Sequence, residues 1–152
     1  MIKNYRLDKS FGPVGAVAGV TIFFTGLILT YFSLVGPIFI LFGAFVGFTS
    51  TSTLIDYDRK RLKYSNNLFG FIQIGQWINL ESNMTIEIKK SNKAWRTYSR
   101  GSRSVDIVNK DYRLILIDSN NKQIMPLMKT PSLDSAKAEF ESLANLLGLR
   151  KE

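Results

Sequence analysis

The chain has 152 residues, of which 45% are apolar, and a net charge of +8. This length is enough for one ordinary domain with a smaller element, and the apolar content excludes a mainly disordered chain. The chain contains no cysteine and no histidine, which excludes disulfides, thiolate or imidazole zinc sites and histidine-activated nucleophiles.

The first third of the chain is a long apolar region, in which no charged residue occurs from Ser10 to Ile55. This region is too long for one buried core helix, and the Gly-Pro pair within Ser33–Pro37 divides it. About 20 apolar residues span a hydrocarbon core of about 30 Å. We therefore predict a helical hairpin that crosses a membrane twice, with spans at Gly12–Phe32 and Gly36–Leu54.

A cleaved signal peptide is the alternative to the first span, because a basic start followed by an apolar run has the same pattern. Ala16–Ala18 would then be the processing site. A processing site should follow the apolar core, whereas this one precedes most of it. Two membrane helices are therefore the preferred interpretation.

The charges beside the apolar region predict its orientation. Cations flank both ends of the region, and the connecting loop has none: Lys3, Arg6 and Lys9 before it, then Arg59, Lys60, Arg61 and Lys63 after it. By the positive-inside rule, both termini are expected in the cytoplasm, as in a multi-pass protein of the cytoplasmic (inner) membrane. The predicted organisation is a cytoplasmic segment over 1–11, a membrane hairpin over 12–54 and a cytoplasmic domain over 55–152.

Two groups of cations are the candidate lipid-binding or partner-binding residues. The first is the group Arg59, Lys60, Arg61 and Lys63, and the second is Lys89, Lys90, Lys93, Arg96, Arg100 and Arg103. We favour the first as a topology determinant that attracts anionic headgroups, worth about 1 kcal/mol per cation, over a specific ligand site. The second is interleaved with Trp95 and Tyr98, a pattern that can stack on nucleic-acid bases. A domain tethered to a membrane is expected to have no nucleic-acid partner, so we favour a solvated loop near an anionic leaflet.

Small residues inside the two spans indicate how the helices pack. Gly15 and Gly19 have small-xxx-small spacing, and so do Gly43 and Gly47 in the second span. Such pairs let helix backbones approach closely in lipid. Packing within the hairpin is preferred, and self-association stays open. Neither span contains an aspartate, glutamate, lysine, arginine or histidine, which argues against an ion or proton pathway.

After Thr53 the sequence changes to short alternating segments separated by turn residues, which predicts an antiparallel β domain. The predicted strands are Ser52–Asp58, Arg61–Asn66, Phe69–Leu80, Asn83–Lys90, Ala94–Arg100, Arg103–Lys110, Asp111–Ser119 and, as an eighth, Lys122–Lys129. The fifth and sixth are either separate or one strand interrupted at Gly101. A helix with Ser132 as N-cap and Gly148 as its stop closes the chain. Its apolar stripe is Leu133, Ala136, Phe140, Leu143 and Leu147.

About seven antiparallel strands followed by one helix resemble a pleckstrin-homology-like barrel. With its two spans, the chain resembles small bacterial membrane proteins that have two N-terminal helices and a cytoplasmic bacterial pleckstrin-homology-like domain. The stretches "IDYDRKRLKYSN" from Ile55 and "FGFIQIGQW" from Phe69, with the final helix, are the resembling parts. The resemblance implies a membrane α-helical hairpin followed by an α+β domain, an antiparallel seven-stranded barrel capped by a C-terminal helix. In eukaryotic members of that fold, cations of the first hairpin grip phosphoinositides, so for Arg59–Lys63 the resemblance implies contact with anionic phospholipid.

Catalytic motifs are missing from the sequence. Asp56 and Asp58 are two residues apart but adjoin Arg59 and Lys60, and therefore favour surface ion pairs. Neither a P-loop nor a nucleophile elbow occurs. We predict no catalytic residue, metal or cofactor. The expected function is a non-enzymatic accessory or assembly subunit of a larger membrane protein complex, and the alternative is a module that recognises anionic lipid headgroups or a peptide.

Overall fold

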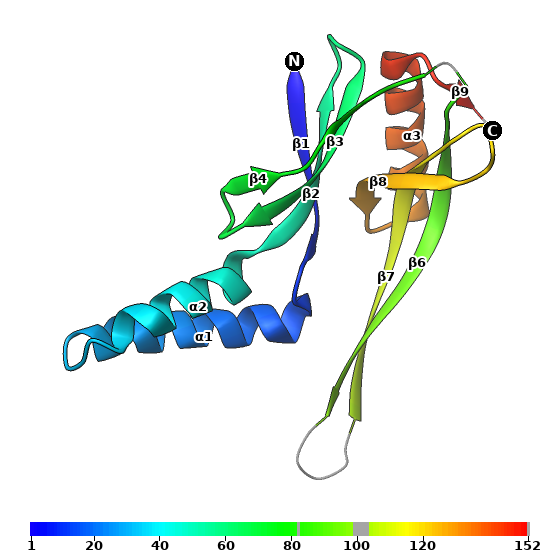
Figure 1. The fold of residues 1–152 in the computed structure, drawn as a ribbon. Helices are drawn as coiled ribbons and strands as arrows, with labels where there is room; N and C mark the ends of the chain where they lie inside the picture. Colours follow the sequence, from blue (N-terminus) through cyan, green and yellow to red (C-terminus); the bar gives the residue numbers. More distant parts are fainter. Residues whose placement is uncertain (82, 99–103, 152) are drawn as a thin grey trace. The chain divides into compact units, whose positions relative to one another are not determined.

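The computed structural model describes residues 1–81, 83–98 and 104–151, which divide into two compact units. The helical unit consists of Asp8–Ser52 and Ser65–Gly75. The strand-rich unit consists of Met1–Leu7, Thr53–Tyr64 and Gln76–Glu152. An N-terminal helix pair, antiparallel sheets and a C-terminal helix together form an α+β arrangement, as the sequence predicts (Figure 1).

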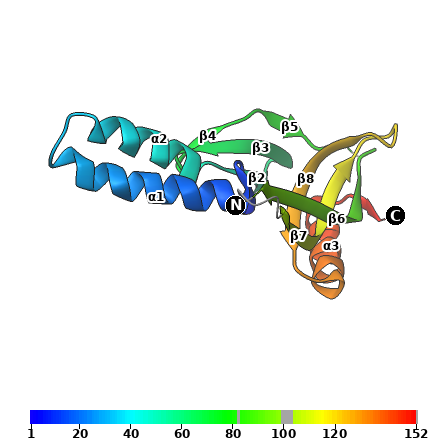
Figure 2. The same cartoon turned by 90° about the horizontal axis from the view of Figure 1, so that it is seen from below.

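The helical unit contains α1 (Gly12–Thr30) and α2 (Gly36–Phe48), which lie side by side in both views (Figures 1 and 2). Each helix has a proline in its first turn, where the missing N–H costs no hydrogen bond. The 19-residue α1 is long and apolar enough to cross a membrane, whereas α2 has 13 residues. The prediction that the second helix continues to Leu54 is therefore wrong.

The early end of α2 follows from the composition of the next five residues. They are all threonine or serine, which compete with the backbone for hydrogen bonds and have low helix propensity. Threonine is also β-branched and favours strands. Thr49 is already extended, with φ −65° and ψ 131°, and the strand β2 (Ser50–Asp56) begins at the following residue.

The first sheet has the strand order β1-β2-β3-β4, with β5 also pairing with β3. Its strands are β1 (Ile2–Lys9), β2, β3 (Arg61–Leu68), β4 (Ile72–Ile74) and β5 (Trp77–Asn79). The prediction of one strand over Phe69–Leu80 is wrong, because β4 and β5 pair with different halves of β3 and Gly75 lies between them. The strand β1 was not predicted, although Tyr5 and Leu7 alternate with polar and charged residues as a half-buried strand does.

The second sheet has the order β8-β7-β6-β9. Its strands are β6 (Thr85–Tyr98), β7 (Ser104–Ile117), β8 (Gln123–Thr130) and β9 (Arg150–Lys151). Four predicted short strands merge into β6 and β7, which pair from Thr85 opposite Ile117 to Tyr98 opposite Ser104. The fifth and sixth predicted strands are thus opposite arms of one hairpin, so the single-strand alternative is wrong. The predicted hairpin between β7 and β8 is confirmed.

The final helix α3 (Leu133–Leu147) begins and ends as predicted. The Ser132 hydroxyl accepts a hydrogen bond from the Ser135 amide at 3.2 Å, and Gly148 has the left-handed φ of 70° that a helix stop favours. Leu143 and Leu147 are buried, whereas Leu133 is 40% exposed. The predicted apolar stripe therefore packs along most of its length but not at its first residue.

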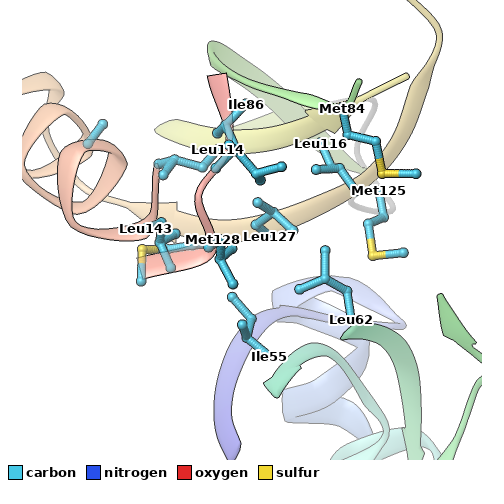
Figure 3. Packing of buried hydrophobic residues seen from close by; sticks show 13 residues of the cluster. Ile55, Leu62, Met84, Ile86, Leu114, Leu116, Met125, Leu127, Met128 and Leu143 are labelled. Carbon is cyan, nitrogen blue, oxygen red and sulfur yellow. The ribbon is translucent and has the colours of Figure 1, made fainter. Parts of the chain in front are cut away.

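The core of the strand-rich unit joins both sheets to α3. Ile55 and Leu62 from the first sheet point toward Leu127 and Met128 from the second (Figure 3). Residues of β6, β7 and α3 complete this cluster, among them Ile86, Leu114, Leu116, Ala136, Leu143 and Leu147. Apolar side chains from two sheets and a helix thus leave water together, which is the main source of stability for this unit.

The predicted closed seven-stranded barrel is not formed, because the described strands belong to two separate sheets. The edge strand β8 contains Pro126, which has no N–H to donate to a further strand. Its carbonyl oxygen accepts a hydrogen bond from the Thr53 hydroxyl of β2 at 2.7 Å. A side-chain contact at this position takes the place of a strand pairing between the sheets.

Candidate binding surfaces

The first basic group lies at the turn between β2 and β3. Arg59 and Lys60 are exposed, and Lys60 has a positive φ of 45° that turns the chain back into β3. The backbone amide of Arg59 donates to Asp56 Oδ1 at 3.4 Å. Asp58 forms an ion pair with the amino group of Met1. The turn therefore presents two solvated cations, and Asp56 holds the backbone of the first.

Arg61 and Lys63 have a different setting from the two turn cations. They lie on the outer face of β3, because Leu62 between them is fully buried in the core. The Arg61 Nε donates to Asp56 Oδ2 at 3.0 Å, and its guanidinium lies 4.4 Å from the centroid of the Trp77 ring. The Lys63 ammonium is 6.0 Å from the same ring. Arg61 is thus already held by a carboxylate and an aromatic ring.

Asp56 has a pKa below its ordinary value of 3.8. Burial of the side chain, which is 5% exposed, disfavours the charged form and alone would raise the pKa. The hydrogen bonds from Arg61 and from the Arg59 amide, together with the Arg61 charge, outweigh that effect. The folded chain therefore keeps Asp56 ionised to lower pH than the unfolded chain does.

This pKa shift makes stability depend on pH in the acid range. A carboxyl group with a depressed folded pKa stabilises the fold above its unfolded pKa, and this contribution is lost as the pH falls through the folded pKa. We expect Asp56→Asn to be less stable than the native chain near neutral pH, with the difference shrinking below about pH 4. Thermal unfolding of the variant and the native chain in detergent, between about pH 6 and pH 2, measures this difference in stability. The exposed Glu141→Gln is the control, and equal pH profiles for the Asp56 variant and the native chain would contradict the role of this ion pair.

The second basic group is only partly described. Lys89 forms an ion pair with Glu87 at 3.1 Å, and Lys90 is exposed. Lys93 and Arg96 lie on β6, where the backbone is described but the side chains are not. Arg100 and Arg103 lie outside the described residues. The structure thus places four of the six predicted cations on one long strand.

The outer halves of β6 and β7 form a two-stranded arm, Ser91–Tyr98 paired with Ser104–Asp111. Beside it, β8 pairs with β7 only between Tyr112 and Ile117, and β9 pairs with β6 only at Thr85 and Ile86. Among the described strands, the arm therefore has no neighbour on either edge. An isolated two-stranded ribbon is at best marginally stable in water.

A buried ion pair at the base of the arm was missed by the sequence analysis. The Arg113 Nε donates to Asp111 Oδ2 at 2.8 Å, and the Lys129 ammonium lies 3.9 Å from the same oxygen. Asp111 and Arg113 are 4% and 8% exposed, respectively. Their spacing of two residues on one strand face is the signal in the sequence, because alternate side chains share a face. The pair lies where the arm meets the part of β7 that pairs with β8.

Three of the four predicted packing glycines lie between α1 and α2. An ideal Cβ on Gly19 would be 2.3 Å from the backbone nitrogen of Gly47, and one on Gly43 would be 2.3 Å from that of Phe23. A Cβ on Gly47 would lie 2.9 Å from the backbone nitrogen of Val20. Gly15 differs, since a Cβ there would meet Phe11, which precedes the same helix. Close contact between the backbones of α1 and α2 therefore begins at Gly19, one helical turn after Gly15, where the spacing predicts it.

No protein-family model, curated protein or solved structure matches the chain. Within the described residues, no group of three or more acidic side chains is placed to hold a metal ion. The arrangement offers exposed cations on the turn between β2 and β3, a cation–aromatic contact between β3 and β5, an arm whose edges have no partner among the described strands, and an apolar helix pair.

Proposed function

We propose that the chain is a non-enzymatic integral membrane protein that acts as an accessory or assembly subunit of a larger membrane protein complex. The helix pair anchors it in the cytoplasmic membrane with both termini in the cytoplasm. The strand-rich unit binds the partner, which is another membrane protein. The unpaired arm of β6 and β7 is the observation that carries this proposal.

Anchoring is supported by the apolar side chains that the helix pair leaves exposed. Val17, Phe24 and Ile28 of α1 are 68%, 58% and 67% exposed, and Ile38 and Phe42 of α2 are 64% and 58% exposed. Soluble proteins rarely expose a continuous apolar surface of this kind. At 1.5 Å per residue α1 is about 28 Å long, which matches a hydrocarbon core of about 30 Å.

Partner binding is supported by the free edges of the arm. Each edge presents backbone N–H and C=O groups, which form a template for a strand from another chain. Such strand addition obtains affinity from main-chain hydrogen bonds and specificity from side chains. The cations on and around the arm favour an acidic partner strand, because complementary charge speeds association and selects the partner.

The test is a shortened arm. Replacing residues 92–110 by Asn-Gly would join Ser91 to Asp111 through a two-residue hairpin turn. Ile86, Leu114 and the buried Asp111–Arg113 pair stay in place, so we expect the thermal midpoint of the core to be retained. A protein that co-purifies in stoichiometric amounts with the native chain from mild detergent should be lost with this variant.

The control variant keeps the arm and removes charge from the turn, as Arg59→Gln with Lys60→Gln. Arg61 stays unchanged because it holds Asp56. We expect this control to retain the partner. If the native chain instead purifies alone, and its binding to liposomes rises with anionic lipid and falls in the control, the chain is a lipid-binding module and the subunit proposal is wrong.

A further inference from the structure

The turn between β3 and β4 is strongly apolar and exposed. We define the hairpin tip as Leu68–Ile74, with the sequence "LFGFIQI". Phe71, Ile72 and Ile74 are 75%, 43% and 55% exposed. Turns usually carry glycine, asparagine, aspartate or serine for reasons of backbone conformation. We propose that the hairpin tip is a third membrane contact, which enters the boundary between lipid headgroups and acyl chains beside α2.

The backbone conformation of the tip disfavours a bulky residue at position 69, so the contacts of the Phe69 side chain explain why phenylalanine is found there. Phe69 and Gly70 both have positive φ angles, 55° and 83°. Asparagine or glycine is preferred at such positions, and a bulky residue there is an outlier. The Phe69 ring lies 5.7 Å from the ring of Phe45 on α2, and its amide donates to the Thr49 hydroxyl at 3.4 Å. The contacts of Phe69 with the end of α2 therefore outweigh the preference of this backbone conformation for asparagine or glycine.

The tip belongs to the same compact unit as the helix pair, which fixes its level along the helices. An ideal Cβ on Gly70 would lie 3.5 Å from the Cβ of Phe48, the last residue of α2. Figure 2 draws β4 close to this end of α2. The exposed side chains of the tip therefore continue the apolar surface of α2 at its cytoplasmic end.

The unequal lengths of the two helices put the first two turns of α1 beyond the level of the tip. At 1.5 Å per residue α2 is about 20 Å long, roughly 10 Å shorter than a hydrocarbon core. Gly47 lies against Gly19, so α1 continues about 10 Å beyond the end of α2. The hairpin tip lies beside the C-terminal end of α2, which stops short of the start of α1.

Two polar features limit how deep the tip can lie. The Lys9 ammonium donates to the Gly47 carbonyl oxygen at 3.1 Å, which puts a charge at the level of the tip. β4 is also the last strand on its side of the described sheet, and open strand edges do not occur in the hydrocarbon region. The tip therefore lies in the interfacial layer, where an apolar face and polar backbone can both be satisfied. This inference rests on the proposed anchoring of the helix pair.

The experiment uses single cysteines in the cysteine-free full chain, labelled with an environment-sensitive fluorophore and reconstituted in phosphatidylcholine liposomes. Phe71→Cys reports on the tip, with Ile74→Cys as a second reporter if the first fails to fold. Phe24→Cys on α1 and Asn121→Cys in the turn before β8 are the membrane and aqueous references. We expect shallow spin-labelled lipids to quench the tip label and deep ones to quench the Phe24 label, whereas aqueous iodide quenches only the Asn121 label.

The references separate failure of this inference from failure of the anchoring. If the tip labels respond to iodide as the Asn121 label does, while the Phe24 label is still quenched by deep spin-labelled lipids, the interfacial contact is wrong and the anchoring stands. If the Phe24 label also responds to iodide, the proposed anchoring is wrong and this inference falls with it.

Discussion

Leu143→Ala should lower the free energy of unfolding of the strand-rich unit by about 2–5 kcal/mol. The Leu143 side chain is 1% exposed and packs in the cluster that α3 shares with β6, β7 and β8. Truncation removes its transfer free energy and leaves a cavity that neighbouring residues from several elements fill only in part. Chemical unfolding of the full chain in detergent, followed by circular dichroism, measures the loss.

Leu146 is the matched control, because it is a leucine of the same helix that is 58% exposed. Leu146→Ala should change the free energy of unfolding by no more than about 0.5 kcal/mol. Equal losses for the two variants would mean that α3 does not pack on its own sheets through the Leu143 face. A larger loss for Leu146 would point to a partner that covers the exposed face.

Gly19→Ala should weaken the helix pair by about 1–3 kcal/mol, as overpacking of a close contact does. The new Cβ would lie 2.3 Å from the backbone nitrogen of Gly47 and 2.7 Å from its Cα. Both atoms belong to the backbone, so no side-chain rotation can relieve the clash and the helices must separate. Titration with sodium dodecyl sulfate, read by energy transfer between dyes on the two helices, measures the change.

The control for Gly19→Ala adds bulk to the same helix on its exposed side. Ala18 is exposed, so Ala18→Val should leave the titration unchanged. The Gly19 effect should also be independent of protein concentration, because both helices belong to one chain. A midpoint that falls on dilution would instead show that these glycines mediate self-association.

Elements with strong local signals could be predicted from the sequence. α1 and α2 begin at Gly12 and Gly36, as predicted, where proline pre-sets the first turn. The limits of α3 follow from its cap at Ser132 and its stop at Gly148, which act within one helical turn. The hairpin of β7 and β8 follows from turn residues between two alternating segments. Each of these signals depends only on residues close in the chain.

The end of α2 and the strand β1 were missed although their signals are also local. The long apolar region predicts a helix through Leu54, whereas the hydroxyl side chains of residues 49–53 favour a strand over a helix. In the first nine residues, the charges are a stronger feature than the alternation of Tyr5 and Leu7 that indicates a strand. At the end of α2, the long apolar run outweighed a local change to threonine and serine, and in β1 the charges outweighed a weak alternation.

The sequence by itself determined the apolar helix pair, the antiparallel strands, the terminal helix and the position of the cations, because composition and short-range period encode them. Only the tertiary structure decided which contacts those cations make, since pairing of β3 with β5 brings Trp77 to Arg61. It also decided that the strands form two sheets with an unpaired arm, and that the apolar hairpin tip lies against α2. These outcomes depend on contacts between distant segments, whose free energy comes from shared burial and has no counterpart in any single stretch of sequence.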